Sequence, residues 1–186
     1  MAVISSMFII SSCGNSNKDS VDEAKDMNEM KDSSEASTAM DENDANFMVE
    51  AANAGMMEVE MGTMAQQKAT DPQVKNFGAM MVRDHTKANE ELKSLAVVKN
   101  VTLPAAMSDN MQRHMNDMRE KTGYNFDKDY MDMMVKDHKD VISKFEHVAE
   151  KGTDADLKTW ASTTLMTLRM HRDSAEYVQK LIKDKK

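Results

Sequence analysis

The stretch DPQVKNFGAMMVRDHTKANEELKSLAVVKN, residues 71–100, determines the fold that the sequence predicts. Asp71 followed by Pro72 is a helix-start signal, because proline suits the first helical position and an aspartate before it can cap the helix. Residues at spacings of three and four then form one mainly apolar stripe: Val74, Phe77, Met81, His85, Ala88, Leu92 and Leu95. This spacing predicts an amphipathic helix that ends near Asn100.

The same periodicity predicts further helices over 44–70, about 105–121, about 126–150 and about 154–182, with Asp44 as the cap of the first of them. The sequence contains no strand candidate. Aromatic residues make up 5% of the chain, and there are 6 glycines and 2 prolines, which argues against a sandwich or barrel. The predicted fold class is therefore all-α.

Loop lengths predict how these helices connect. The links at 70–72 and 150–154 are short, so each joins two long helices into an antiparallel hairpin. The longer segment 100–125 carries the short helix and can cross over between the hairpins. The expected architecture is a ferritin-like four-helix bundle with a short extra helix in the connection between the two hairpins. A plain up-down bundle with a decorated loop is the alternative.

The N-terminus resembles a lipoprotein signal. Residues 1–12 are uncharged and mostly apolar or small, and Ile10-Ser11-Ser12-Cys13 matches a bacterial lipobox, although no basic residue precedes it. Cys13 is the one cysteine, so no intramolecular disulfide can form. We expect residues 1–13 to be a signal-peptide remnant and lipobox, with a lipid on Cys13. The lipid would anchor the protein in the cell envelope, in the periplasm or at the outer membrane. An incidental cysteine in a ragged N-terminus is the alternative.

Residues 14–42 differ in composition from the rest of the chain. They contain nine acidic residues, three lysines and no aromatic residue, so they are expected to form a disordered acidic tether. A transient charged helix within 21–31 is compatible with this composition. The bundle is expected to occupy 43–186. The formal net charge of -8 makes nucleic acid an improbable partner, because phosphates attract basic clusters, and the sequence leaves any protein partner open.

Four polar side chains fall on the inward stripes of the predicted long helices: Glu58, His85, His138 and His171. All four lie near mid-helix, so in an antiparallel bundle they share one layer. Burying them is costly unless they bond to one another or to a ligand. Three imidazoles and a carboxylate suit zinc, copper or iron, and a metal-free hydrogen-bonded cluster is the alternative.

The residues before two of these histidines repeat. Met81-Val82-Arg83-Asp84-His85 nearly matches Met134-Val135-Lys136-Asp137-His138. The repeat suggests two related helix pairs. It also places Asp84 and Asp137 where they can serve as further metal ligands or orient the imidazoles.

The chain contains 21 methionines, which we interpret mainly as replacements for leucine in the core. His114, flanked by Met111, Met115 and Met118, is a second and weaker candidate, for the soft ion copper(I). His147 lies off the apolar stripe and is expected to be solvated.

Several of these segments together resemble the bacterial domain-of-unknown-function family 4142, over about residues 43–182. The resemblance rests on the following residues: Phe47 through Ala52, Gly55 through Glu60, Val74 through Phe77, Met81 through His85 with Ala88-Asn89, Leu103-Pro104, Tyr130, Met134-Val135, His138 and His171. It implies a ferritin-like bundle in an exported or outer-membrane protein, and the family has no established activity.

One departure bears on chemistry. Ferritin-like di-iron sites use Glu-x-x-His, whereas Val82 and Val135 stand three residues before His85 and His138. The sequence therefore favours a non-catalytic metal-binding lipoprotein of the cell envelope. The alternatives are a structural, interaction or stress module with a metal-free polar core, and an oxygen- or peroxide-handling metalloenzyme.

Overall fold

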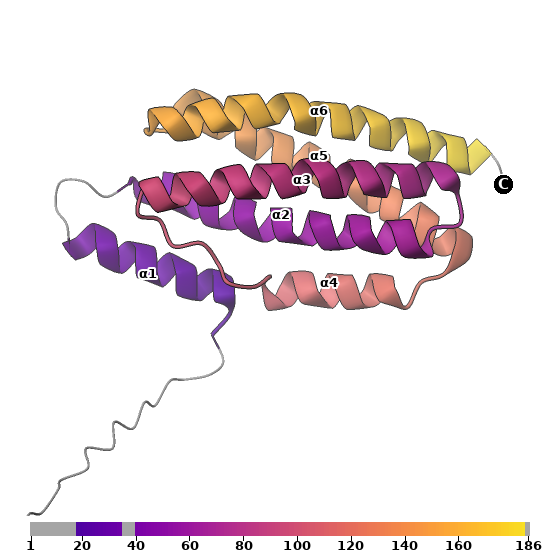
Figure 1. The fold of residues 1–186 in the computed structure, drawn as a ribbon, viewed down its shortest axis with the longest axis horizontal. Coiled ribbons are helices and arrows are strands. Elements are labelled where there is room, and N and C mark those ends of the chain that lie inside the picture. The colour runs from indigo at the N-terminus through magenta and orange to yellow at the C-terminus, as the bar shows by residue number, and fades with distance from the viewer. Residues whose placement is uncertain (1–17, 35–39, 185–186) are drawn as a thin grey trace, which may run out of the picture.

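The computed structural model describes residues 18–34 and 40–184, and these form six helices with no strand among them (Figure 1). In chain order the helices are α1 (Ser20–Ser34), α2 (Glu42–Lys68), α3 (Pro72–Val98), α4 (Asp109–Arg119), α5 (Gly123–Lys151) and α6 (Ala155–Asp184). The all-α prediction is confirmed. The long helices end within a few residues of the predicted boundaries.

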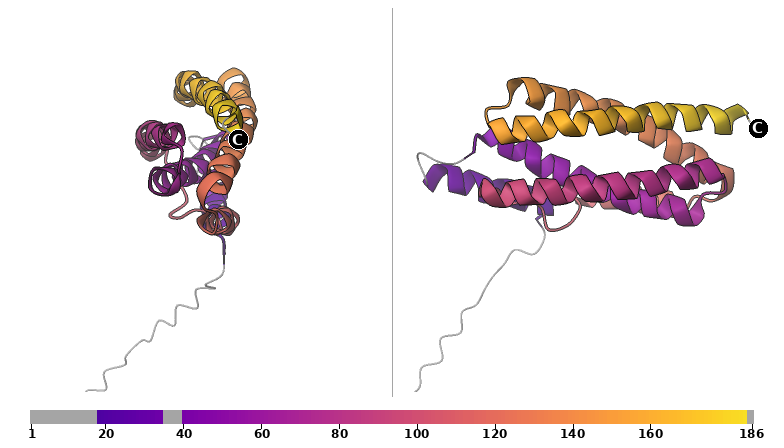
Figure 2. Two further views of the ribbon diagram at one scale, coloured as in Figure 1. Left: turned by 90° about the vertical axis from the view of Figure 1, so that its right-hand side faces the viewer. Right: turned by 45° about the horizontal axis from the view of Figure 1, so that its top comes forward.

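The four long helices lie side by side as two hairpins. The α2–α3 hairpin packs beside the α5–α6 hairpin, as the end-on view of Figure 2 shows. In Figure 1, α3 and α5 run in the same direction. Between them in chain order, α4 runs in the opposite direction and carries the chain back along the molecule. The connection between the hairpins is therefore a crossover that contains the short helix.

Each hairpin has one buried aspartate that bonds to the turn of the other hairpin. Asp44, on α2, accepts hydrogen bonds from the backbone N–H groups of Thr153 and Asp154, each at 2.8 Å. Asp127, on α5, accepts from the N–H groups of Thr70, at 3.0 Å, and of Asp71, at 2.8 Å. Both carboxylates also accept a bond from the threonine hydroxyl of the turn that they hold.

The cap predicted for α2 was wrong. Asp41, not Asp44, is the N-cap, and its side chain accepts from the N–H groups of Asn43 and Asp44. Asp44 lies inside the first turn and is 3% exposed. A carboxylate at this place satisfies amides of a distant turn instead of those of its own helix.

The apolar core has two parts. One cluster is rich in methionine and includes Met57, Met61, Met64, Met81, Met115, Met118, Met131 and Met134. The other contains most of the buried leucines, with Phe47 and Phe145. The interpretation of the methionines as core residues is confirmed for these positions. In the methionine-rich part, α2 and α3 approach so closely that a Cβ on Gly62 or on Gly78 would stand 2.7 Å from the carbonyl oxygen of the other glycine.

Helix α1 corrects the prediction of a disordered tether at 14–42. Asn28 exchanges two hydrogen bonds with the backbone of Thr102, of 2.7 and 2.9 Å. Lys25 pairs with Glu50 on α2 at 3.1 Å. The acidic composition does exclude a large apolar face, but α1 is held mainly by side-chain bonds to backbone and to charges.

The N-terminal segment with Cys13 and its lipobox lies outside the described residues. Among the helices that the structure describes, none is long and apolar enough to cross a membrane.

Candidate metal centre

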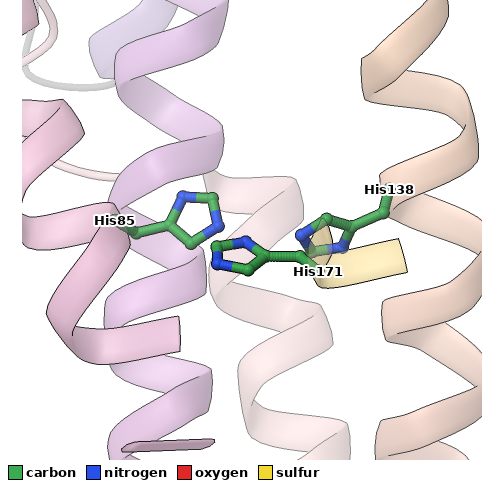
Figure 3. Close-up of side chains that lie close together, drawn as sticks. All are labelled: His85, His138 and His171. Carbon is green, nitrogen blue, oxygen red and sulfur yellow. The ribbon is translucent and has the colours of Figure 1, made fainter. Parts of the chain in front are cut away.

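Three long helices each contribute one histidine to a common point. His85 extends from α3, His138 from α5 and His171 from α6, and the three rings face one another (Figure 3). The ring centroids are 5.2 to 5.8 Å apart. One ring nitrogen of each lies within 4.8 Å of the others. The layer predicted from the sequence therefore exists for the three histidines.

The cluster lies where the two apolar core clusters meet. On α5, Met134 belongs to the methionine-rich cluster and Ile142 to the other, and His138 lies between them. On α6, His171 lies between Leu168 and Ala175 in the same way. The exposed fractions are 9% for His85, 1% for His138 and 0% for His171. Three imidazoles thus form a polar layer inside an otherwise apolar core.

Hydrogen bonds determine the tautomers of two of these rings. Nδ1 of His138 is 2.9 Å from the Met134 carbonyl, which can only accept, so Nδ1 carries the proton. Nε2 of His171 is 3.0 Å from an oxygen of Asp84, which is ionised and also only accepts. Each ring therefore presents a lone pair on its other nitrogen.

Those lone pairs have no partner within the protein. Among the described residues, Nε2 of His138, Nδ1 of His171 and Nε2 of His85 are buried without a hydrogen bond. Buried polar atoms are rarely left without a partner, because the lost hydration costs free energy. A metal ion is a ligand that accepts several neutral imidazole lone pairs at once.

Asp84 orients His171, which lies on a different helix. Arg83 holds the same carboxylate by two hydrogen bonds, of 2.7 and 2.9 Å. The Arg83 contact, and after it the His171 contact, lower the pKa of Asp84 to about 2, against an opposing effect of burial. A carboxylate that bonds the outer nitrogen of a metal-binding histidine is a common arrangement in metal sites. Its predicted counterpart, Asp137, makes no contact of this kind with His138; burial raises the pKa of Asp137.

All three imidazoles are neutral near pH 7. Burial lowers the pKa of His85 to about 3 and that of His138 to about 4, with further lowering by the neighbouring histidines. Burial also lowers the pKa of His171, although Asp84 opposes the shift. The His171–Asp84 contact is thus a hydrogen bond from a neutral ring to a charged carboxylate. Neutral imidazole is the form that binds metals.

Glu58 is near the cluster but does not belong to it. No carboxylate of the described residues joins the three nitrogens within 4.8 Å. Glu58 is 5% exposed, and its Oε2 atom has no hydrogen-bond partner. Burial, and after it the charge of Asp137, raise the pKa of Glu58 to about 8. Glu58 lines a cavity together with His85 and His138.

The two weaker histidine candidates, His114 and His147, lie outside the three-histidine cluster. Met115 and Met118 are buried in the core, whereas His114 is exposed and lines the same cavity as Glu58. His147 is exposed, as expected. The sequence reasoning missed Asp127, which holds the Thr70-Asp71 turn as Asp44 holds the Thr153-Asp154 turn, although the two pairs are separated by different lengths of chain.

The chemistry of this donor set is metal coordination through nitrogen. Three imidazoles provide three of the four positions of a tetrahedral zinc site, at bond lengths of about 2.0–2.1 Å. To bind one such ion, the three nitrogens, which lie within 4.8 Å of one another, would have to come closer together. The helices that carry them are rigid and well packed, so the three Cα positions are fixed in advance.

Comparison with known proteins identifies a family. No curated protein matches the chain. No solved structure matches it either. One family model, described as a domain of unknown function (DUF4142), matches residues 29–178, which include most of the fold and all three histidines. The chain therefore belongs to the DUF4142 family.

Proposed function

We propose that the protein binds one transition metal ion through His85, His138 and His171. The observation that supports this most is the set of three buried ring nitrogens without partners, within reach of one ion. Two of the rings are held in the tautomer that directs a lone pair toward the others. Asp84 orients His171 from outside the site.

Imidazole donors suit zinc, copper and iron, and the absence of thiolate at the cluster disfavours soft-metal chemistry there. Glu58 and Asp137 line the same cavity as His85 and His138, and they belong to the proposal as groups that can reach the ion after side-chain movement. Because the cluster itself consists of three histidines and lacks the Glu-x-x-His pairs of di-iron sites, it suits retention or delivery of a metal better than di-iron oxidation. The function proposed is binding and not catalysis.

Isothermal titration of chelator-treated protein with Zn²⁺, Cu²⁺ and Fe²⁺ tests this proposal. One ion per chain should bind, and metal should raise the melting temperature of the wild type but not of His138→Ala. His147→Ala is the matched control on the same helix, because His147 is exposed and away from the cluster. If no metal binds, or if His138→Ala binds it equally well, the histidines form a metal-free polar core of a structural or interaction module.

The proposal includes an envelope location. The lipobox at Cys13 supports a lipid anchor, and the crossover of the helices supports a ferritin-like bundle as the exported domain. Helix α1 would then begin a few residues after the anchor and hold the bundle near the membrane surface. Cys13→Ala should release the protein from the membrane fraction; if the variant still sediments with membranes, the anchor lies elsewhere.

A further inference from the structure

A cavity of about 900 Å³, partly open to solvent, lies beside the histidine cluster. Its walls come from all four long helices, and residues of α1 and α4 also line it. Small residues of α2 and α3 are part of the lining: Ala51, Ala54, Gly55 and Ala88. This volume is in the range of small-molecule sites, and the lining is mostly apolar, as such sites are.

The two ends of the cavity differ in chemistry. At one end, Phe47, Phe145 and Trp160 form an aromatic cluster, with ring centroids 4.9 to 6.3 Å apart. At the other end is Glu58, next to His85 and His138. Phe47 and Glu58 lie about 16 Å apart along α2, from the rise per residue of a helix. The cavity is thus elongated, with an apolar end and a polar end.

The polar end contains acceptors that nothing in the described part of the protein satisfies. Oε2 of Glu58 and Nε2 of His138 are buried and have no hydrogen-bond partner. Glu58 is almost fully buried and has no cation beside it, so an ionised carboxylate there lacks a counter-charge. A ligand group that donates hydrogen bonds and is positively charged would satisfy both needs.

The charge of the lining agrees with such a ligand. Seven carboxylates and three lysines line the cavity. The lysines are already paired: Lys25 and Lys144 bind Glu50, and Lys136 binds Asp140. The surplus of negative charge attracts cations and repels fatty-acid carboxylates.

We propose that this cavity binds a small cationic amphiphile, whose ammonium head lies at Glu58 and whose apolar chain extends toward Phe47 and Trp160. This site is distinct from the metal site in its principal residue, because Glu58 is not among the three clustered histidines. Both proposals use Nε2 of His138, so the test below uses metal-free protein and variants that affect the two ligands differently. A neutral amphiphile of the same length would gain the apolar contacts but not the ion pair.

Isothermal titration with three probes of equal chain length tests the proposal: decylamine, decanol and decanoate. The protein is the full chain with Cys13→Ala, free of detergent and treated with a chelator, so that neither a lipid of its own nor a metal competes. Decylamine should bind more tightly than decanol, and decanoate should bind least. Glu58→Gln should lower decylamine affinity by about tenfold or more, because it removes one partner of a buried charge pair, and should leave decanol affinity nearly unchanged.

Two further variants make the result specific. Glu60→Gln is the matched control, since Glu60 is exposed on the same helix and pairs with Arg119; it should leave all three affinities unchanged. His171→Ala should abolish metal binding yet retain decylamine, because His171 does not line the cavity. Failure of decylamine to bind, equal affinity for the three probes, or a decylamine affinity unaffected by Glu58→Gln would overturn the proposal, whatever the result for metal.

Discussion

His171 on α6 and Asp84 on α3 are joined by a hydrogen bond of 3.0 Å that crosses between the two hairpins. Asp84 is one residue before His85 in the chain, so a single segment of α3 supplies one histidine of the cluster and orients another. The mirror position in the sequence repeat, Asp137, has no such contact. Two similar pentapeptides therefore have different roles, because α3 and α5 present them to different neighbours.

Asp84→Asn should lower metal affinity by about 10- to 100-fold, the usual effect of removing the charged partner of a metal-binding histidine. Nitrogen NMR of the imidazoles should show that His171 no longer keeps a single tautomer. Asp140→Asn is the control of equal chemistry, since Asp140 on α5 is exposed and pairs with Lys136, and it should change neither quantity. An unchanged affinity in Asp84→Asn would mean that His171 does not coordinate metal through Nδ1.

Glu58 should make the stability of the protein depend on pH in a defined direction. Its pKa is about 8 in the folded protein, against 4.5 as the ordinary value, so the folded state holds this proton more tightly. The stabilisation that the tightly held proton of Glu58 gives to the folded state is fully present below pH 4.5. It is lost as pH rises through 8. Over that window the loss is of the order of 3–5 kcal/mol.

Urea unfolding of wild type and Glu58→Gln at several pH values measures this effect. The difference in unfolding free energy should shift in favour of Glu58→Gln as pH rises from 4.5 to 8. The histidines titrate in both proteins, so their opposite contribution, which is lost as pH falls below 6.5, cancels from the difference. A difference that does not vary with pH would show that Glu58 is ionised in the folded state.

Asp127→Ala should destabilise the fold by about 1–3 kcal/mol, because it leaves partly buried N–H groups at the α2–α3 turn without their acceptor. The backbone N–H groups concerned belong to Thr70 and Asp71. Asp129→Ala, on the same turn of α5, should cost at most about 1 kcal/mol, since its pairs with Lys121 and Lys128 are partly exposed. Equal losses of stability in the two variants would contradict the role of Asp127 as the residue that holds the turn.

Helix α1 should protect the N-terminal region from proteases. Limited proteolysis should leave a resistant fragment that begins before Ser20, and not one that begins near residue 43. Asn28→Ala should make cleavage within α1 faster, since it removes both bonds to Thr102. Glu29→Ala, an exposed neighbour, is the control. Rapid cleavage of the wild type within α1 would contradict stable docking.

Periodicity predicted most of the fold because long amphipathic helices leave a clear trace in sequence. The inward positions of His85, His138 and His171 followed from spacing alone, since each histidine continues an apolar stripe. Helix α1 left no such trace. Its composition correctly excluded a large apolar face, but bonds from Asn28 and Lys31 to the backbone of the 100–102 segment do not produce a periodic pattern.

The details of the site depended on tertiary geometry. Spacing could place Glu58 on an inward stripe, but not whether its oxygen reaches the ring nitrogens. Asp84 could be recognised as a neighbour of His85, yet its partner His171 lies 87 residues further along the chain. Side-chain direction across a helix contact decides both points, and a single sequence does not specify it.

Elemental analysis of protein purified without a histidine tag, from cells grown with adequate zinc, copper and iron, tests metal binding most directly. Wild type should contain about one transition metal ion per chain, consistent with one three-histidine site. Variants His85→Ala and His138→Ala, checked by circular dichroism to be folded, should contain almost none. Metal-free wild type, or equal metal in these variants and in wild type, would contradict a metal centre at His85, His138 and His171.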